Sequence, residues 1–93
     1  METLETDTTG LAATLMTEGY ELLELDWRPT PRLPGGYACY FVFAWLPGLE
    51  DTEDAFYEGS IRVDPQKYGR VYGQLRRRMH ASRKEQISEA AAG

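Results

Sequence analysis

The stretch Gly59–His80, GSIRVDPQKYGRVYGQLRRRMH, holds the clearest structural signals in the chain. Asp64 is suited to accept hydrogen bonds from the free amides of a helix start, and Pro65 has its φ angle already set for the first helical position. Apolar side chains then recur every three or four residues, at Tyr68, Val71, Tyr72, Leu75 and Met79. We therefore predict an amphipathic helix over Pro65–Ser88, preceded by a short strand over Ser60–Val63.

Two glycines interrupt this predicted helix. Gly69 and Gly73 each cost about 1 kcal/mol relative to alanine in a helix interior. Bare backbone at these two positions indicates that another element or a ligand comes close to the helix there.

Further elements are predicted between the N-terminus and Gly59. Periodicity and turn residues indicate, in order, a helix over about Thr9–Glu18 ended by Gly19, a strand over Tyr20–Arg28, a Pro/Gly-rich connection over 29–36, a strand over Tyr37–Leu46 and a helix that ends before Gly59. We expect a compact α+β domain of order α-β-β-α-(β)-α, with helices packed on a small antiparallel sheet and a long C-terminal helix. This single domain spans residues 9–88, between flexible tails at 1–8 and 89–93.

The predicted strand Tyr37–Leu46, YACYFVFAWL, is almost wholly apolar, which is typical of a strand covered on both faces. Helices on one side of so small a sheet leave the other side bare. We expect a second copy of the chain to cover it, forming a dimer or higher homo-oligomer, or the aromatic side chains to line a pocket. Cys39 lies within this strand and is interpreted as a core residue.

From its composition we expect a soluble protein of the cytoplasm. Its one cysteine leaves no internal disulfide, no apolar run approaches the length of a membrane span, and the acidic N-terminus is unlike a secretory signal. The net charge of −5 conceals a division along the chain, because residues 1–58 carry −10 and residues 59–93 carry +5. The division indicates an anionic partner for the basic part, a self-complementary assembly, or two parts that balance each other.

Signatures of catalysis do not occur in the sequence. There is no nucleophile elbow, no phosphate-binding loop and no zinc-ligand set, and the single histidine, His80, has no acidic residue close to it in sequence. The acidic run at Glu50, Asp51, Glu53 and Asp54 suits the first turn of a helix better than a calcium loop. We expect a non-enzymatic protein without cofactor or metal.

Binding of an anionic ligand is better supported. Arginine presents a planar fork that fits phosphate, and tyrosine can stack on a base. We expect one side of the last helix and the segment before it to bind a nucleotide-like ligand, and a cluster of Tyr57, Arg62 and Tyr68 to lie between subunits. The candidate ligand-binding residues are Tyr57, Arg62, Lys67, Tyr68, Arg70, Gln74, Arg77 and Arg78. The alternative is that these basic residues only solvate the helix or pair with the acidic part.

Three segments together resemble a small domain of unknown function that is common in phages and prophages. They are LAATLMTEGYELLELD, then YFVF, then YEGSIRVDPQKYGRVYGQLRRRM, and the resemblance spans Thr9–His80. The connection over 29–36 is longer than is usual in that family, and residues 85–93 lie outside its pattern. The resemblance implies an accessory protein that acts in the host cytoplasm, with no established activity.

Three functions remain open at this point. The first is a phage sponge that sequesters a nucleotide used in host immune signalling. The second is a protein-binding anti-defence antagonist or assembly factor that uses the aromatic surface of residues 37–45. The third is a nucleic-acid-binding accessory protein, which the −10 charge of residues 1–58 disfavours because DNA phosphates would be repelled.

Overall fold

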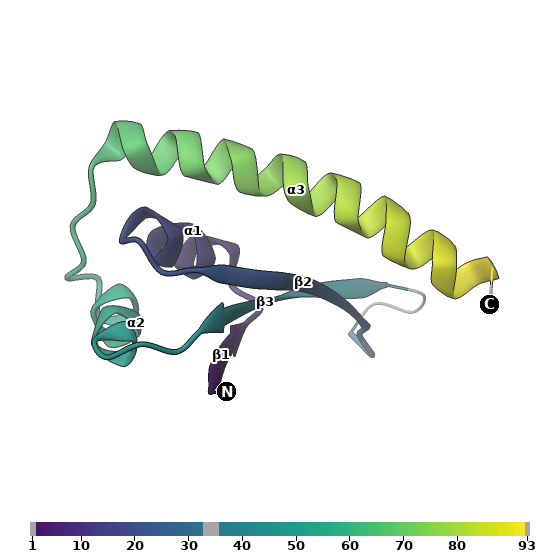
Figure 1. Cartoon of the computed structure of the whole chain (residues 1–93), viewed down its shortest axis with the longest axis horizontal. Coiled ribbons are helices and arrows are strands. Elements are labelled where there is room, and N and C mark those ends of the chain that lie inside the picture. The colour runs from purple at the N-terminus through teal and green to yellow at the C-terminus, as the bar shows by residue number, and fades with distance from the viewer. Residues whose placement is uncertain (1, 33–35, 93) are drawn as a thin grey trace.

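The computed structural model describes residues 2–32 and 36–92, with side chains described as far as residue 87. Three strands and three helices follow one another as β1 (Thr3–Thr6), α1 (Thr9–Thr17), β2 (Leu22–Pro29), β3 (Tyr37–Ala44), α2 (Leu49–Glu58) and α3 (Pro65–Ala92). α1 and the long α3 lie over the same side of the sheet, and α2 lies at one end of it (Figure 1). The predicted α+β class with a long C-terminal helix is confirmed.

The sheet is antiparallel with the strand order β1-β3-β2, so the apolar strand β3 is central. Residues directly opposite one another share a face, and the pairs Leu25–Phe41 and Leu4–Phe43 therefore belong to the same face. Phe41 and Phe43 are fully buried on that face. α1, α2 and α3 complete the core with Leu11, Ala12, Ala13, Leu15, Leu49 and Leu75.

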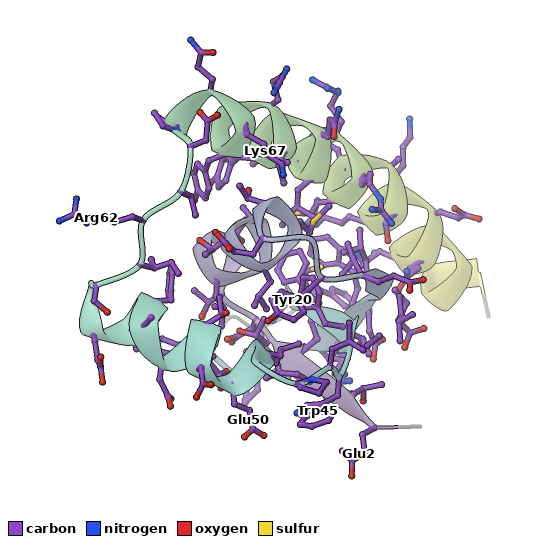
Figure 2. All side chains as sticks on the ribbon, turned by 60° about the vertical axis from the view of Figure 1, so that its left-hand side comes forward. Glu2, Tyr20, Trp45, Glu50, Arg62 and Lys67 are labelled. Atoms are coloured by element: carbon purple, nitrogen blue, oxygen red, sulfur yellow. The ribbon has the colours of Figure 1, made fainter. Side chains whose placement is uncertain are left out.

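Two expectations about the strands were wrong. Residues 3–6 of the expected tail form β1, which pairs with β3 through backbone hydrogen bonds that leave no periodic signal in so short a segment. Ser60–Val63 forms no strand, because the amides of Ser60 and Ile61 both donate to the carbonyl of Ala55 at the end of α2. Arg62 points away from the body of the molecule in this segment (Figure 2).

The helix boundaries follow the predicted signals. The Oδ1 atom of Asp64 accepts hydrogen bonds from the amides of Gln66 at 2.9 Å and Lys67 at 3.4 Å. Gly19, just beyond α1, has a φ of +98° that favours glycine. α3 continues past the expected end to Ala92, so most of the expected C-terminal tail is helical. Of the predicted connection, residues 33–35 lie outside the described residues.

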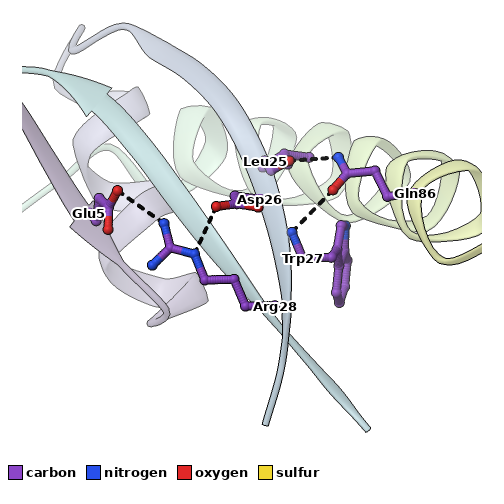
Figure 3. A network of polar contacts seen from close by, with 6 residues as sticks. All are labelled: Glu5, Leu25, Asp26, Trp27, Arg28 and Gln86. Carbon is purple, nitrogen blue, oxygen red and sulfur yellow. Dashed lines mark hydrogen bonds and ion pairs between the residues drawn. The ribbon is translucent and has the colours of Figure 1, made fainter. Parts of the chain in front are cut away.

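A side chain from α3 closes the outer edge of β2. Trp27 donates its backbone N–H to Oε1 of Gln86 at 3.2 Å, and Nε2 of Gln86 donates to the carbonyl of Leu25 at 2.7 Å (Figure 3). Ser82 accepts from both the Trp27 indole N–H and the Gln86 amide. Gln86 thus takes the place of a neighbouring strand, at an edge where unpaired backbone groups would otherwise be open to another chain.

The second face of the sheet carries a polar network across all three strands. Arg28 on β2 donates to Glu5 on β1 at 3.0 Å and to Asp26 at 2.7 Å (Figure 3). Its guanidinium carbon lies 4.3 Å from the ring centre of Tyr40 on β3. The hydrogen bond to Glu5 and then that to Asp26 raise the pKa of Arg28 further above its ordinary value. Val42 is only 6% exposed on this face. The chain's own side chains therefore provide part of the cover that we expected from a second copy.

Replacing Gln86 tests the closure of the edge. We expect Gln86→Ala to lower the free energy of unfolding by about 1–3 kcal/mol, because the Trp27 N–H and the Leu25 carbonyl lose their partner. Urea denaturation measures the change. Gln74→Ala, on the solvent-exposed side of the same helix, is the matched control and should stay within about 0.5 kcal/mol of the parent. Equal effects of the two substitutions would contradict the role of Gln86.

Candidate functional site

The predicted ligand-binding residues fall into two groups in the structure. The first group is exposed in a row along the solvent-facing side of α3, and we call it the basic strip: Lys67, Arg70, Gln74, Arg77 and Arg78. Its spacing of three and four residues places neighbours on one side of a helix. Arg77 borders one hollow of about 240 Å³, and Arg78 borders another of about 380 Å³ that Glu24 and Glu85 also line. No single hollow is lined by all five residues of the strip, as far as the described lining residues show.

The other three predicted residues lie apart from the strip. Tyr57 on α2 is 62% exposed, and its hydroxyl lies 3.4 Å from that of Thr8. Arg62 points into solvent before α3 begins (Figure 2). Tyr68 packs on the core side of α3, where its ring stacks on Tyr72 with centres 5.9 Å apart. Burial, and then the neighbouring Tyr72, raise the pKa of Tyr68. The structure does not gather Tyr57, Arg62 and Tyr68 into one cluster within this chain.

A concave site lies on another flank of α3. Arg76, His80 and Arg83 are spaced by four and three residues and so share this flank. They border a hollow of about 140 Å³, which we call the Trp27 groove and which is lined by Thr9, Trp27, Tyr72, Arg76, Met79, His80 and Arg83. Two more open hollows share residues with it along the helix. One of about 340 Å³ includes His80, Arg83, Lys84 and Ile87, and one of about 240 Å³ is lined by Arg76, Arg77 and His80.

Trp27 has a fixed position in the groove. Its indole N–H donates to Ser82 at 3.2 Å, and its backbone is held by Gln86. The guanidinium carbon of Arg83 lies 6.0 Å from the centre of the Trp27 ring. An aromatic ring beside an arginine is the pairing that proteins use to stack a base and bind its phosphate.

The described side chains at the groove are basic. Among the residues whose side chains the structure describes, none that lines the groove or the two adjoining hollows is acidic. Thr9 begins α1, and the start of a helix carries a partial positive charge; the preceding residue, Thr8, does not cap it with its side chain. The groove therefore combines three basic side chains with the favourable end of a helix dipole.

The basic residues of α3 are not neutralised by the acidic part of the chain. Among the described side chains, ion pairs join only Arg28 with Glu5 and Asp26, and Arg32 with Asp7. Direct pairing between the two oppositely charged parts was one of our alternatives for the charge division. No such ion pair occurs among residues 2–32 and 36–87. The described cations of α3 can therefore pair with a ligand or with another protein.

Sequence reasoning missed most of the groove. The spacing of Arg76, His80 and Arg83 beside the apolar stripe was a usable signal for a basic flank. The contribution of Trp27 had no such signal, because it depends on where β2 lies relative to α3. Arg77 is the one residue of the predicted set that borders an adjoining hollow.

The two glycines of α3 are not required by packing inside the chain. Apart from the adjoining residues and the backbone of α3, a Cβ atom at Gly69 would meet no described atom within 4 Å, and one at Gly73 would meet only Nη1 of Arg77 at 3.8 Å. Gly10 is different, because a Cβ there would lie 3.3 Å from the ring of Phe56. Gly10 therefore lets α2 approach α1, whereas the bare backbone at Gly69 and Gly73 faces outward from the fold.

Other kinds of site find no support in the part of the chain that the structure describes. No group of three or more acidic, histidine or cysteine side chains is arranged to hold a metal ion there. Glu50 and Asp51 lie in the first turn of α2, as predicted for the acidic run. Within the same residues, no helix has an apolar run long enough to cross a membrane.

Cys39 gives a direct test of the core. It is 7% exposed, and burial, followed by the negative charge of Asp26, raises the pKa of its thiol to about 11. At about pH 8 only about one thiol in a thousand is then ionised, and only the thiolate reacts. We expect a disulfide reagent to leave the native protein unmodified and to label one thiol per chain in urea. Rapid labelling of the native protein would contradict the packing of β3.

Comparisons with protein-family models, with curated proteins and with solved structures found no match to this chain. The resemblance to a phage domain remains a prediction.

Proposed function

We propose that this protein binds a small anionic, nucleotide-like ligand in the Trp27 groove and does so without chemical turnover. The observation that carries the proposal is the convergence of Arg76, His80 and Arg83 with the Trp27 ring in one hollow, whose described lining residues include no acidic side chain. The α3 cations support it, because none of them forms an ion pair with a described carboxylate.

The two chemical halves of a nucleotide match different parts of the groove. The ring of Trp27 offers a surface on which a base can stack, and Tyr72 lines the same hollow. Arg76 and Arg83 provide charged N–H donors for phosphate oxygens. The adjoining hollow of about 340 Å³ lies within the range of about 300–1,000 Å³ that small-ligand sites occupy.

Binding without turnover corresponds to a sequestering role. His80 borders the groove, yet none of the described residues that line the hollow is a carboxylate that could orient or polarise it as a general base. In a phage-type accessory protein, as the resemblance implies, such a site would remove a nucleotide that signals host immunity. DNA is a less suitable ligand, because the net charge is −5 and the groove is short.

Titration with defined nucleotides tests the proposal. Trp45→Phe leaves Trp27 as the single tryptophan, whose emission should change on binding. We expect at least one ligand from a panel of ADP, ADP-ribose and cyclic dinucleotides to bind in calorimetry and to quench that emission. Arg76→Ala or Arg83→Ala should weaken binding by about tenfold or more, since each removes a charged donor.

The matched control is Arg70→Ala, which removes the same charge from the basic strip on the other side of the helix. It should leave the affinity within about twofold, because surface charges contribute little at this distance under physiological salt. Absence of heat with every nucleotide of the panel would overturn the proposed function. So would an equal loss of affinity in the Arg70 and Arg83 variants.

A further inference from the structure

An apolar and acidic surface lies on the side of the molecule away from α3. Trp45 and Leu46 follow β3 and are 37% and 50% exposed. The carbonyl of Glu2 accepts the backbone N–H of Trp45, and Glu50 lies in the nearby first turn of α2. Figure 2 shows Trp45 between Glu2 and Glu50, with Lys67 on the far side of the molecule. We call Glu2, Trp45, Leu46 and Glu50 the acidic tip.

Neither the acidic tip nor the basic strip is neutralised inside the chain. The three ion pairs among the described side chains involve Arg28 and Arg32 with Glu5, Asp7 and Asp26. The carboxylates of the tip and the cations of the strip therefore both face solvent without a partner in residues 2–32 and 36–87. One chain thus presents two surfaces of opposite charge on opposite sides.

We propose that the acidic tip of one copy docks on the basic strip of a second copy, in a head-to-tail contact. Charge complementarity between Glu2 and Glu50 and the arginines of the strip would orient the two copies. Trp45 would supply the apolar centre of the contact and can stack on an arginine of the strip. In this assembly the contact is made by Trp45 and Leu46, which follow β3, and not by the face of the sheet.

The glycines of α3 suit this contact. Gly73 lies three residues after Arg70 and four before Arg77, so its bare backbone is on the helix surface between two cations of the strip. Beyond the adjoining residues and the helix's own backbone, the one described atom within 4 Å of the position a Cβ would take there is Nη1 of Arg77. In the proposed contact, this surface would receive the indole ring of Trp45 from the second copy.

A head-to-tail contact leaves one tip and one strip free at the two ends of every open assembly. Copies therefore add until a ring closes, or they continue as an open chain. None of the strip residues is among those that line the Trp27 groove itself, although Arg77 borders a hollow that adjoins it. Because exposed charges hold the contact together, salt should weaken it. We expect association to weaken by about tenfold or more between about 20 mM and about 500 mM NaCl.

Two double variants test the contribution of each surface to the association separately. The tip variant is Trp45→Ala with Glu50→Gln, and the strip variant is Arg70→Gln with Arg77→Gln. All four side chains are exposed, so both variants should fold, which circular dichroism checks. Sedimentation velocity should show that the parent associates as its concentration rises, whereas each variant alone stays monomeric.

Mixing the two variants gives the decisive result. The tip variant keeps an intact strip and the strip variant keeps an intact tip, so the mixture should form a one-to-one heterodimer that cannot grow. Arg76→Gln with Arg83→Gln is the matched control, and it should associate like the parent. A parent that is monomeric at low salt and high concentration would overturn the proposal. Association that persists unchanged in the tip or the strip variant would overturn it too.

Discussion

The contact between the second half of α3 and the edge of β2 is the interaction on which the rest of the structure depends. Gln86 bonds both to the amide of Trp27 and to the carbonyl of Leu25, and Ser82 receives the indole N–H. These bonds fix the position of the 28-residue helix α3 along the sheet and its rotation about its own axis. The other contacts of α3 with the core are made by its apolar stripe. The same bonds hold Trp27 in place, so the fold and the groove share one anchor.

The second constraint is electrostatic. A chain with −10 in its first 58 residues and +5 in the remainder would be expected to pair these charges. Instead, Arg28 and Arg32 take up the ion pairs found among the described side chains, all with acids of the same N-terminal part. α3 is left with cations on two flanks. One flank borders a groove with an aromatic wall, and the other is the exposed basic strip, so the two proposals assign different partners to the groove and to the strip.

Local signals predicted most of the helices and strands. The Asp64–Pro65 start of α3, the glycine after α1, the alternation in β2 and the apolar run of β3 are encoded by neighbouring residues. β1 was missed because Thr3–Thr6 is polar and short, and only pairing with β3 makes it a strand. Ser60–Val63 alternates like a strand, yet its first two amides are used to end α2. The groove depends on contacts between residues more than 50 positions apart, such as Trp27 and Ser82, which no local pattern reports.

The central claim is that α3 closes the edge of β2 through Gln86, and amide hydrogen exchange at Trp27 tests it most directly. Trp27 lies on an edge strand, and its amide has no partner strand on that side. If Gln86 holds it, nuclear magnetic resonance should find that this amide exchanges about as slowly as the amides of the central strand β3. Exchange at the rate of an unprotected edge amide would contradict the account, because neither the position of α3 nor the groove beside Trp27 would then be fixed.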